Sequence, residues 1–197
     1  MQAFVVAWVL FGLWFLHLGI GAAVFGLSVQ LWPEYKCDQI PTPLGVSVFA
    51  GCAAMTNSFF GLANTCVDFL DLRVLMIFET LVSIFYLGTG VYLCVNLPHI
   101  ASCTTTDETA RYSRITNNIT NGGCSYGGVT PIYPQATEFS SEDLTIKRCQ
   151  IAQADYIFEF AGFLLGLWMV WLVHLHRNFG GNTTPDGDST SEDGDDV

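Results

Sequence analysis

The chain has 197 residues, of which 51% are hydrophobic and only 13% are charged, and its mean hydropathy is +0.41. Soluble helices rarely stay apolar on every face over long stretches, so this composition argues against an ordinary soluble domain. The formal net charge is −11. The sequence offers no basic patch that could neutralise phosphates, which argues against a nucleic-acid partner.

Four apolar segments are long enough to cross a bilayer as helices, for which about 20 residues are needed. They cover about residues 3–31, 44–66, 74–97 and 154–175. Helices satisfy their own backbone groups in lipid, so they are the natural spanning structure. The first segment has no basic residues before it and is longer than a signal peptide, so we expect it to be retained. The sequence therefore predicts an all-α membrane protein, a four-transmembrane-helix bundle with both termini on one side.

The predicted membrane domain covers residues 1–177 and includes an outer loop at 98–150. Within this loop, 107–115 is predicted to form a short helix capped by Thr106, and 129–133 a short strand. The tail at 178–197 holds six acidic residues and no basic one. Such a segment cannot bury enough apolar surface to fold, so we predict a disordered cytosolic tail.

Two features of the loops give opposite orientations. Cys37, Cys103, Cys124 and Cys149 all lie in loops on one side, and four cysteines allow two disulfides with three pairings. Disulfides persist in oxidising compartments, and the sequon at Asn118 lies in the same loop. By contrast, five of the seven basic loop residues lie on this side, which the positive-inside rule would place in the cytosol. We favour the cysteines and the sequon, which put the loops outside and the termini in the cytosol.

Ionisable side chains within spans are costly in lipid, so they usually face the bundle interior and have partners. His17, Glu79 and Glu159 are such residues. At about 1.5 Å per residue, Glu79 lies near the inner boundary, at the level of Asn57 and Asn64 of the second span. Glu159 lies near the outer boundary, and His17 is expected closer to its level. We therefore expect Glu79 to pair with Asn57 or Asn64.

Small residues recur at a spacing of four, which lets helix backbones approach closely in lipid. These candidate packing positions are Gly19, Ala23, Ala50, Ala54, Ser58, Gly162 and Gly166.

Two explanations of Glu79 follow. In the structural one, a protonated or hydrogen-bonded carboxyl ties the third span to the second. In the other, Glu79, Glu159 and His17 form part of a proton or cation pathway. Transporters usually have spans broken by Gly or Pro near the midplane, and no proline interrupts a span here. The structural explanation is therefore the leading one.

The sequence predicts no enzyme and no cofactor. A haem in a bundle requires two facing histidines at one depth, but His174 and His176 are expected at the opposite end from His17. The sequence contains neither a CxxC nor an HExxH motif. We therefore expect no metal site and no catalytic residues.

Two further features suggest contacts with lipid or cytosolic proteins. Cys66, at the end of the second span, is a candidate for palmitoylation. The tail ends in GDDV, and a terminal Val197 with Asp195 two residues earlier is typical of a ligand for PDZ domains.

The layout resembles the tetraspanin plan: a short first loop, the very short VDFLDLR connection and a larger cysteine-bearing loop. The segment FGLWFLHLGIGAAVFGLSVQLW resembles the first span of that family, and Glu79 and Glu159 lie in spans where it often has acidic or amide residues. Its Cys-Cys-Gly signature is absent. The segment TPLGVSVFAGCAA resembles the second-span entry of the membrane-spanning four-domain family of the B-lymphocyte antigen type.

Either resemblance implies a non-enzymatic organiser that binds other membrane proteins laterally, in the plasma membrane or another secretory-pathway membrane. A second copy of the chain is a further candidate partner. One alternative is a small transporter or channel subunit that uses Glu79, Glu159 and His17. Another is a viral envelope membrane protein.

Overall fold

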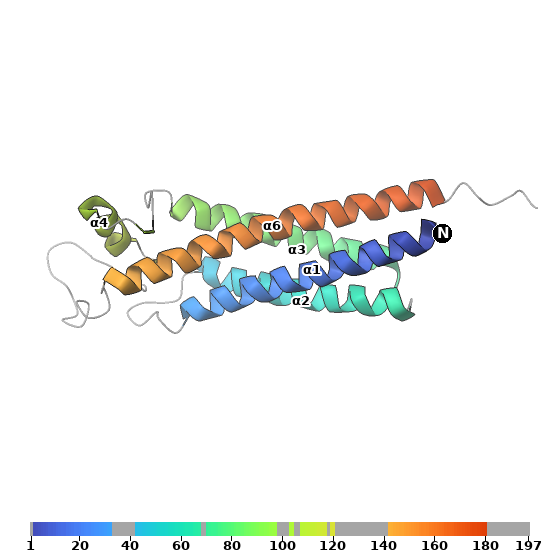
Figure 1. The fold of residues 1–197 in the computed structure, drawn as a ribbon, viewed down its shortest axis with the longest axis horizontal. Helices are drawn as coiled ribbons and strands as arrows, with labels where there is room; N and C mark the ends of the chain where they lie inside the picture. The colour runs from blue at the N-terminus through green and yellow to red at the C-terminus, as the bar shows by residue number, and fades with distance from the viewer. Residues whose placement is uncertain are drawn as a thin grey trace, which may run out of the picture.

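The computed structural model describes residues 2–32, 42–67, 70–97, 103–104, 107–117, 119–120 and 142–180. Five helices are described: α1 (Gln2–Leu31), α2 (Thr42–Val67), α3 (Leu72–Asn96), α4 (Glu108–Thr116) and α6 (Glu142–Gly180). Four of them are long and lie side by side along the molecule, while the short α4 lies beyond one end of this bundle (Figure 1). The all-α four-helix prediction is confirmed.

The four long helices run alternately up and down. Helices α1 and α3 each pack against both α2 and α6, so every long helix has two principal neighbours. The N-terminal end of α1 and the C-terminal end of α6 lie at the same end of the bundle (Figure 1). We call this the terminal end, and the end near α4 the lobe end.

All four long helices contain a segment with the length and composition to cross a membrane. These segments are Trp8–Leu31, Leu44–Val67, Leu72–Asn96 and Asp143–Leu175. Large apolar side chains cover much of the outer surface of these helices, as a lipid-facing surface requires. The chain is therefore a four-span integral membrane protein.

Two side chains, one asparagine and one aspartate, accept backbone hydrogen bonds in the connection between α2 and α3. The Asn64 Oδ1 accepts a hydrogen bond from the Leu70 backbone N–H at 2.7 Å. Asp71 is the N-cap of α3, and its side chain accepts from the Arg73 N–H at 2.9 Å. These contacts satisfy backbone donors that the start of a helix would otherwise leave open. Asn64 therefore holds the turn and does not pair with Glu79, which corrects one of our two expectations for that carboxyl.

Helix α6 is longer than its span. We expected the outer loop to continue to residue 150, but the helix begins at Glu142 and has 39 residues. At about 1.5 Å per residue it is about 58 Å long, well beyond the thickness of a hydrocarbon core. No Pro or Gly lies between 142 and 161, so nothing in this stretch interrupts the helix. The first turns of α6 thus belong to the outer region of the molecule.

The described outer region, which we call the lobe, consists of residues 103–104, α4, residues 117 and 119–120, and the first turns of α6. A disulfide joins Cys103 to Cys149 of α6. Apolar residues at the lobe end pack around it, and we call this set the lobe-end cluster: Leu31, Leu44, Leu93, Leu97, Cys103, Ile119, Cys149, Ile151 and Ala152. Lobe and bundle therefore share one apolar core.

The predicted short helix in the loop is present as α4. It begins one residue later than expected, and Asp107, rather than Thr106, occupies the N-cap position. The Asn117 amide after α4 donates to the Asn96 carbonyl oxygen at the end of α3 at 2.6 Å. The Thr120 hydroxyl donates to the Arg114 carbonyl oxygen. The lobe is thus tied to α3 as well as to α6.

Several sequence predictions lie outside the described residues. They are the cysteines Cys37 and Cys124, the sequon asparagine Asn118, the strand at 129–133, and the tail with Asp195 and Val197.

Candidate functional site

Polar side chains from all four spans meet in the interior of the bundle. We call this set the polar row, and every member is at most 6% exposed: His17, Ser28, Ser47, Asn57, Ser58, Glu79, Ser83, Tyr86, Thr89, Asp155 and Glu159. Hydrocarbon offers such groups no hydrogen-bond partners, so their placement inside the bundle has a direct energetic cause.

Glu79 of α3 is the centre of the row. One carboxylate oxygen, Oε2, accepts a hydrogen bond from the Asn57 amide of α2 at 2.7 Å. The other, Oε1, lies 3.4 Å from Nε2 of His17 on α1. The contact with Asn57 was expected from the depth of the two residues. Glu79 thereby connects three of the four spans.

His17 has a different partner from the one its assumed depth suggested. We expected it near the level of Glu159, but its ring lies between Ser58 and Glu79. The Ser58 hydroxyl is 3.1 Å from His17 Nδ1. These two contacts place His17 at the level of Glu79 in α3. The end of an apolar run does not fix how deep a residue lies relative to its neighbours on other helices.

Ser58, His17 and Glu79 thus form a chain of hydroxyl, imidazole and carboxyl. This order of groups is also that of serine hydrolases, in which the imidazole takes the hydroxyl proton. Here all three side chains are fully buried. In the described conformation these three side chains can hold protons between them, but the Ser58 hydroxyl faces no open surface.

Tyr86 of α3 connects this chain to the other acidic residues of the row. Its ring meets the His17 ring edge-on, with centroids 6.0 Å apart and an interplanar angle of 85°. The phenol also interacts electrostatically with Glu79, Glu159 and Asp155. The phenol is thus a neighbour of acidic residues in both parts of the row.

Asp155 and Glu159 form the lobe-end part of the row. The Ser28 hydroxyl of α1 donates to Asp155 Oδ2 at 2.7 Å. Ser47 and Thr89 face Glu159, but the Thr89 hydroxyl donates to the Phe85 carbonyl oxygen instead. Both Glu159 carboxyl oxygens and Asp155 Oδ1 have no hydrogen-bond partner among the described residues.

Our sequence analysis missed Asp155 as an intramembrane residue. It is the second residue of the predicted fourth span at 154–175. A signal was present, because Asp155, Glu159, Gly162 and Gly166 follow the spacing of one helix face.

Two glycines of α6 make room for polar side chains of α3. A Cβ atom on Gly166 would lie 2.1 Å from Ser83 Oγ and 2.7 Å from Glu79 Oε1. A Cβ atom on Gly162 would lie 2.7 Å from the Tyr86 ring. The predicted packing role of both glycines thus has a steric basis: each lets α6 approach a polar residue of α3.

The predicted small-residue positions of α1 and α2 have mixed outcomes. Ala50, Ala54 and Ser58 are fully buried, in agreement with close packing. Gly19 is exposed, with open space where a Cβ atom would lie, so its packing role was wrong. Ala23 is half-buried. The close approach on α1 is made instead by Gly21, whose Cβ atom would lie 3.1 Å from Ala54.

Apolar side chains close the row at both ends. The lobe-end cluster lies beyond Asp155. A second set, the terminal-end cluster, lies beyond Glu79 and His17 and consists of Leu13, Trp14, Leu165 and Met169. Trp14 is 2% exposed and Met169 fully buried. In this conformation the polar row is therefore occluded from both ends of the bundle.

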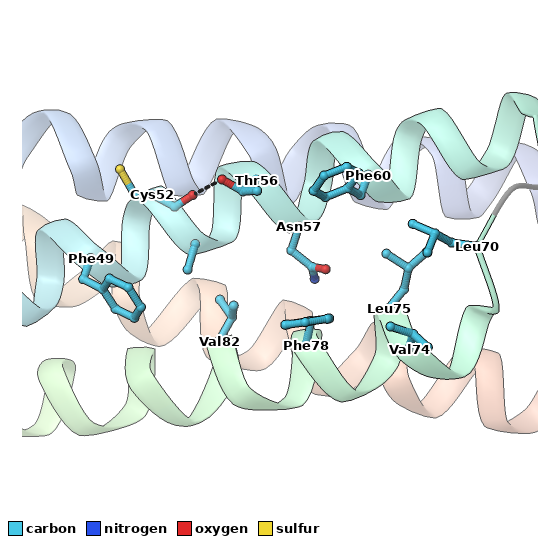
Figure 2. Close-up of a pocket in the computed structure, with 11 residues that line it drawn as sticks. Phe49, Cys52, Thr56, Asn57, Phe60, Leu70, Val74, Leu75, Phe78 and Val82 are labelled. Atoms are coloured by element: carbon cyan, nitrogen blue, oxygen red, sulfur yellow. Dashed lines mark hydrogen bonds between the residues drawn. The ribbon is translucent and has the colours of Figure 1, made fainter.

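A groove of about 580 Å³ runs between α2 and α3 on the lipid-facing side of the spans. Figure 2 shows the side chains of both helices projecting into it, with the Asn57 amide at its centre. Phe49, Phe60 and Phe78 are exposed at its mouth, whereas Asn57 is 6% exposed. Asn57 is thus shared between the groove and the polar row.

Metal binding is not supported by the geometry of the part of the chain that the structure describes. Within it, no group of three or more His, Cys, Asp or Glu side chains is arranged to hold a metal ion.

Comparison of the chain with protein-family models, curated proteins and solved structures found no match. The resemblance to tetraspanins and to the second four-span family therefore rests on the four-span plan and the sequence segments quoted above.

Proposed function

We propose that the protein is a non-enzymatic membrane scaffold. It associates laterally with other membrane proteins or with copies of itself, and it presents its lobe to partners. The tetraspanin-like layout supports this role by resemblance. In the same proposal the lobe faces the exterior or the lumen of a secretory-pathway membrane, and the termini face the cytosol.

The observation that carries this proposal is the continuity of α6 from the lobe into the membrane. Its 39 residues form one helix that bears Cys149 at the lobe end and Glu159 in the polar row. A partner that binds the lobe is thereby coupled mechanically to the packed interior of the bundle. Such coupling suits a protein that positions its binding partners and does not catalyse a reaction.

The lobe also offers an outward-facing aromatic side chain. Tyr112 on α4 is 72% exposed, and Arg111 beside it is exposed as well. Tyr and Arg are the residues most often found at the energetic centres of protein interfaces. We propose this pair as part of the partner-binding surface.

Affinity purification in a mild detergent tests the scaffold role. The wild-type protein is expected to retain stoichiometric membrane partners, and the double variant Arg111→Ala, Tyr112→Ala to lose them. The control is Trp171→Ala, which truncates an exposed aromatic side chain on the span of α6 instead of the lobe. Retention of all partners by the lobe variant would contradict the proposed surface.

A proton-coupled transporter is the second candidate, favoured by the unpartnered oxygens of Glu159 and Asp155. Purified protein in liposomes with an internal pH dye would then show proton flux that is lost in Glu159→Gln. Absence of flux above that of empty liposomes would reject this candidate.

A further inference from the structure

The contacts of His17 place its two ring nitrogens next to Ser58 and Glu79, so the tautomer of His17 decides how protons are held there. If the Ser58 hydroxyl accepts from His17 Nδ1–H, Nε2 faces Glu79 Oε1 across 3.4 Å. A single proton between these two atoms then makes the pair neutral overall. It rests either on the carboxyl, next to a neutral imidazole, or on the imidazole, next to a carboxylate. Loss of this proton would leave one buried, uncompensated negative charge.

The surroundings of Glu79 favour the neutral carboxyl. From α1 it faces His17, from α2 Asn57, from α3 Ser83 and Tyr86, and from α6 the backbone of Gly166. No cationic side chain other than His17 is among these described neighbours. Separating charge inside a low-dielectric interior is costly, so a neutral carboxyl beside a neutral imidazole is favoured over an ion pair.

The α2–α3 groove offers an approach to the contact partner of Glu79. The two apolar clusters close the bundle lengthwise, but the α2–α3 groove reaches Asn57 from the lipid (Figure 2). The Asn57 amide is in direct contact with Glu79 at 2.7 Å. A small apolar molecule dissolved in the bilayer can therefore approach the carboxyl through a rotation of one side chain.

We propose that Glu79 is an occluded proton-binding site, shared with His17, which lipid-dissolved molecules reach through the α2–α3 groove at Asn57. This inference is independent of the scaffold role. It assigns to the groove a class of ligand: small apolar molecules with one group that reacts with, or hydrogen-bonds to, a neutral carboxylic acid.

Dicyclohexylcarbodiimide is a probe with these properties, because it partitions into lipid and reacts with protonated carboxyls. The Glu79 proton moves to a reagent nitrogen, and the carboxyl oxygen bonds to the central carbon. Transfer of the acyl group from oxygen to nitrogen then gives a stable N-acylurea. No atom leaves and nothing is oxidised, so the Glu79 peptide gains the full mass of the reagent.

The experiment treats the full-length protein in liposomes at neutral pH and maps the labelled peptide by mass spectrometry. Labelling is expected at Glu79 and is abolished in Glu79→Gln. Thr56→Phe, which fills the groove, is expected to reduce Glu79 labelling to background. The matched control is Thr80→Phe: Thr80 is also exposed and also donates to the carbonyl four residues earlier, but it does not line the groove.

Infrared spectroscopy supplies an independent readout of the proton. The wild-type protein is expected to show a neutral carboxyl band that is missing from Glu79→Gln. Absence of that difference would overturn the proton site. Equal labelling of Glu79 in Thr56→Phe and Thr80→Phe would overturn the groove as its access route, as would an unlabelled Glu79 that shows the infrared band.

Discussion

Two asparagines of α2 make contacts in two different parts of the bundle. Asn57 donates to Glu79 inside the polar row, whereas Asn64 accepts from the Leu70 N–H at the turn into α3. The two residues are seven positions apart and so lie on one helix face, which explains why sequence alone could not distinguish their partners. Asn64 pairs with the turn because the Leu70 backbone N–H lies within hydrogen-bond distance of its side-chain oxygen.

Asn64→Ala removes that acceptor and leaves a partly buried backbone N–H unsatisfied. We expect the unfolding free energy to fall by about 1 kcal/mol. Asn64→Asp keeps an acceptor oxygen and should remain within a few tenths of a kcal/mol of wild type. Unfolding in mixed micelles with increasing SDS measures both. An equal loss in the two variants would show that the acceptor is not what matters.

At the scale of helices, close approach between α1 and α2 depends on glycines, of which Gly61 is one. A Cβ atom on Gly61 would lie 2.3 Å from the Trp14 indole ring, which is buried and cannot move aside freely. Gly45 on the same helix has open space around the corresponding position. Both positions are glycines of α2, but only Gly61 is required for close packing against α1.

Gly61→Ala is expected to lower the unfolding free energy by about 1–3 kcal/mol through overpacking against Trp14. Gly45→Ala should be neutral or stabilising by up to about 1 kcal/mol, since Ala favours the helix. The measurement is the SDS unfolding midpoint, with Trp fluorescence as the probe. Equal effects of the two substitutions would contradict the packing of α1 on α2.

The elements themselves were largely predictable, since apolar length defined the four spans and rise per residue placed Glu79 near Asn57. The errors arose where geometry between helices decides. The depth of His17 depends on where α1 enters the membrane, which its continuous apolar run from 3 to 31 does not mark. Asp155 and the start of α6 were misplaced because a helix can continue past its span without any change in backbone pattern.

At the scale of the whole molecule, the lobe and the bundle are joined by α6, by the lobe-end cluster and by one described disulfide. Cys103 and Cys149 are separated by 46 residues. In the chain-entropy description, a cross-link over a loop of this length stabilises by about 4 kcal/mol. This is large for a lobe that has few apolar residues of its own.

The double variant Cys103→Ser, Cys149→Ser should therefore loosen the lobe while leaving the spans assembled. Limited proteolysis is expected to cleave the variant within α4 at protease concentrations that leave this helix intact in the wild type. The SDS unfolding midpoint of the spans serves as the control and should change little. Unaltered proteolysis would mean that α6 and the lobe-end cluster suffice to hold the lobe.

The central claim is that Glu79 joins the helices through Asn57, and a double-mutant cycle tests it most directly. SDS unfolding of Asn57→Ala, Glu79→Ala and the double variant should give a coupling energy of about 0.6–1.7 kcal/mol. The control cycle of Asn64→Ala with Glu79→Ala should be additive within about 0.5 kcal/mol. Additivity between Asn57 and Glu79, or coupling of Glu79 to Asn64 instead, would contradict the account.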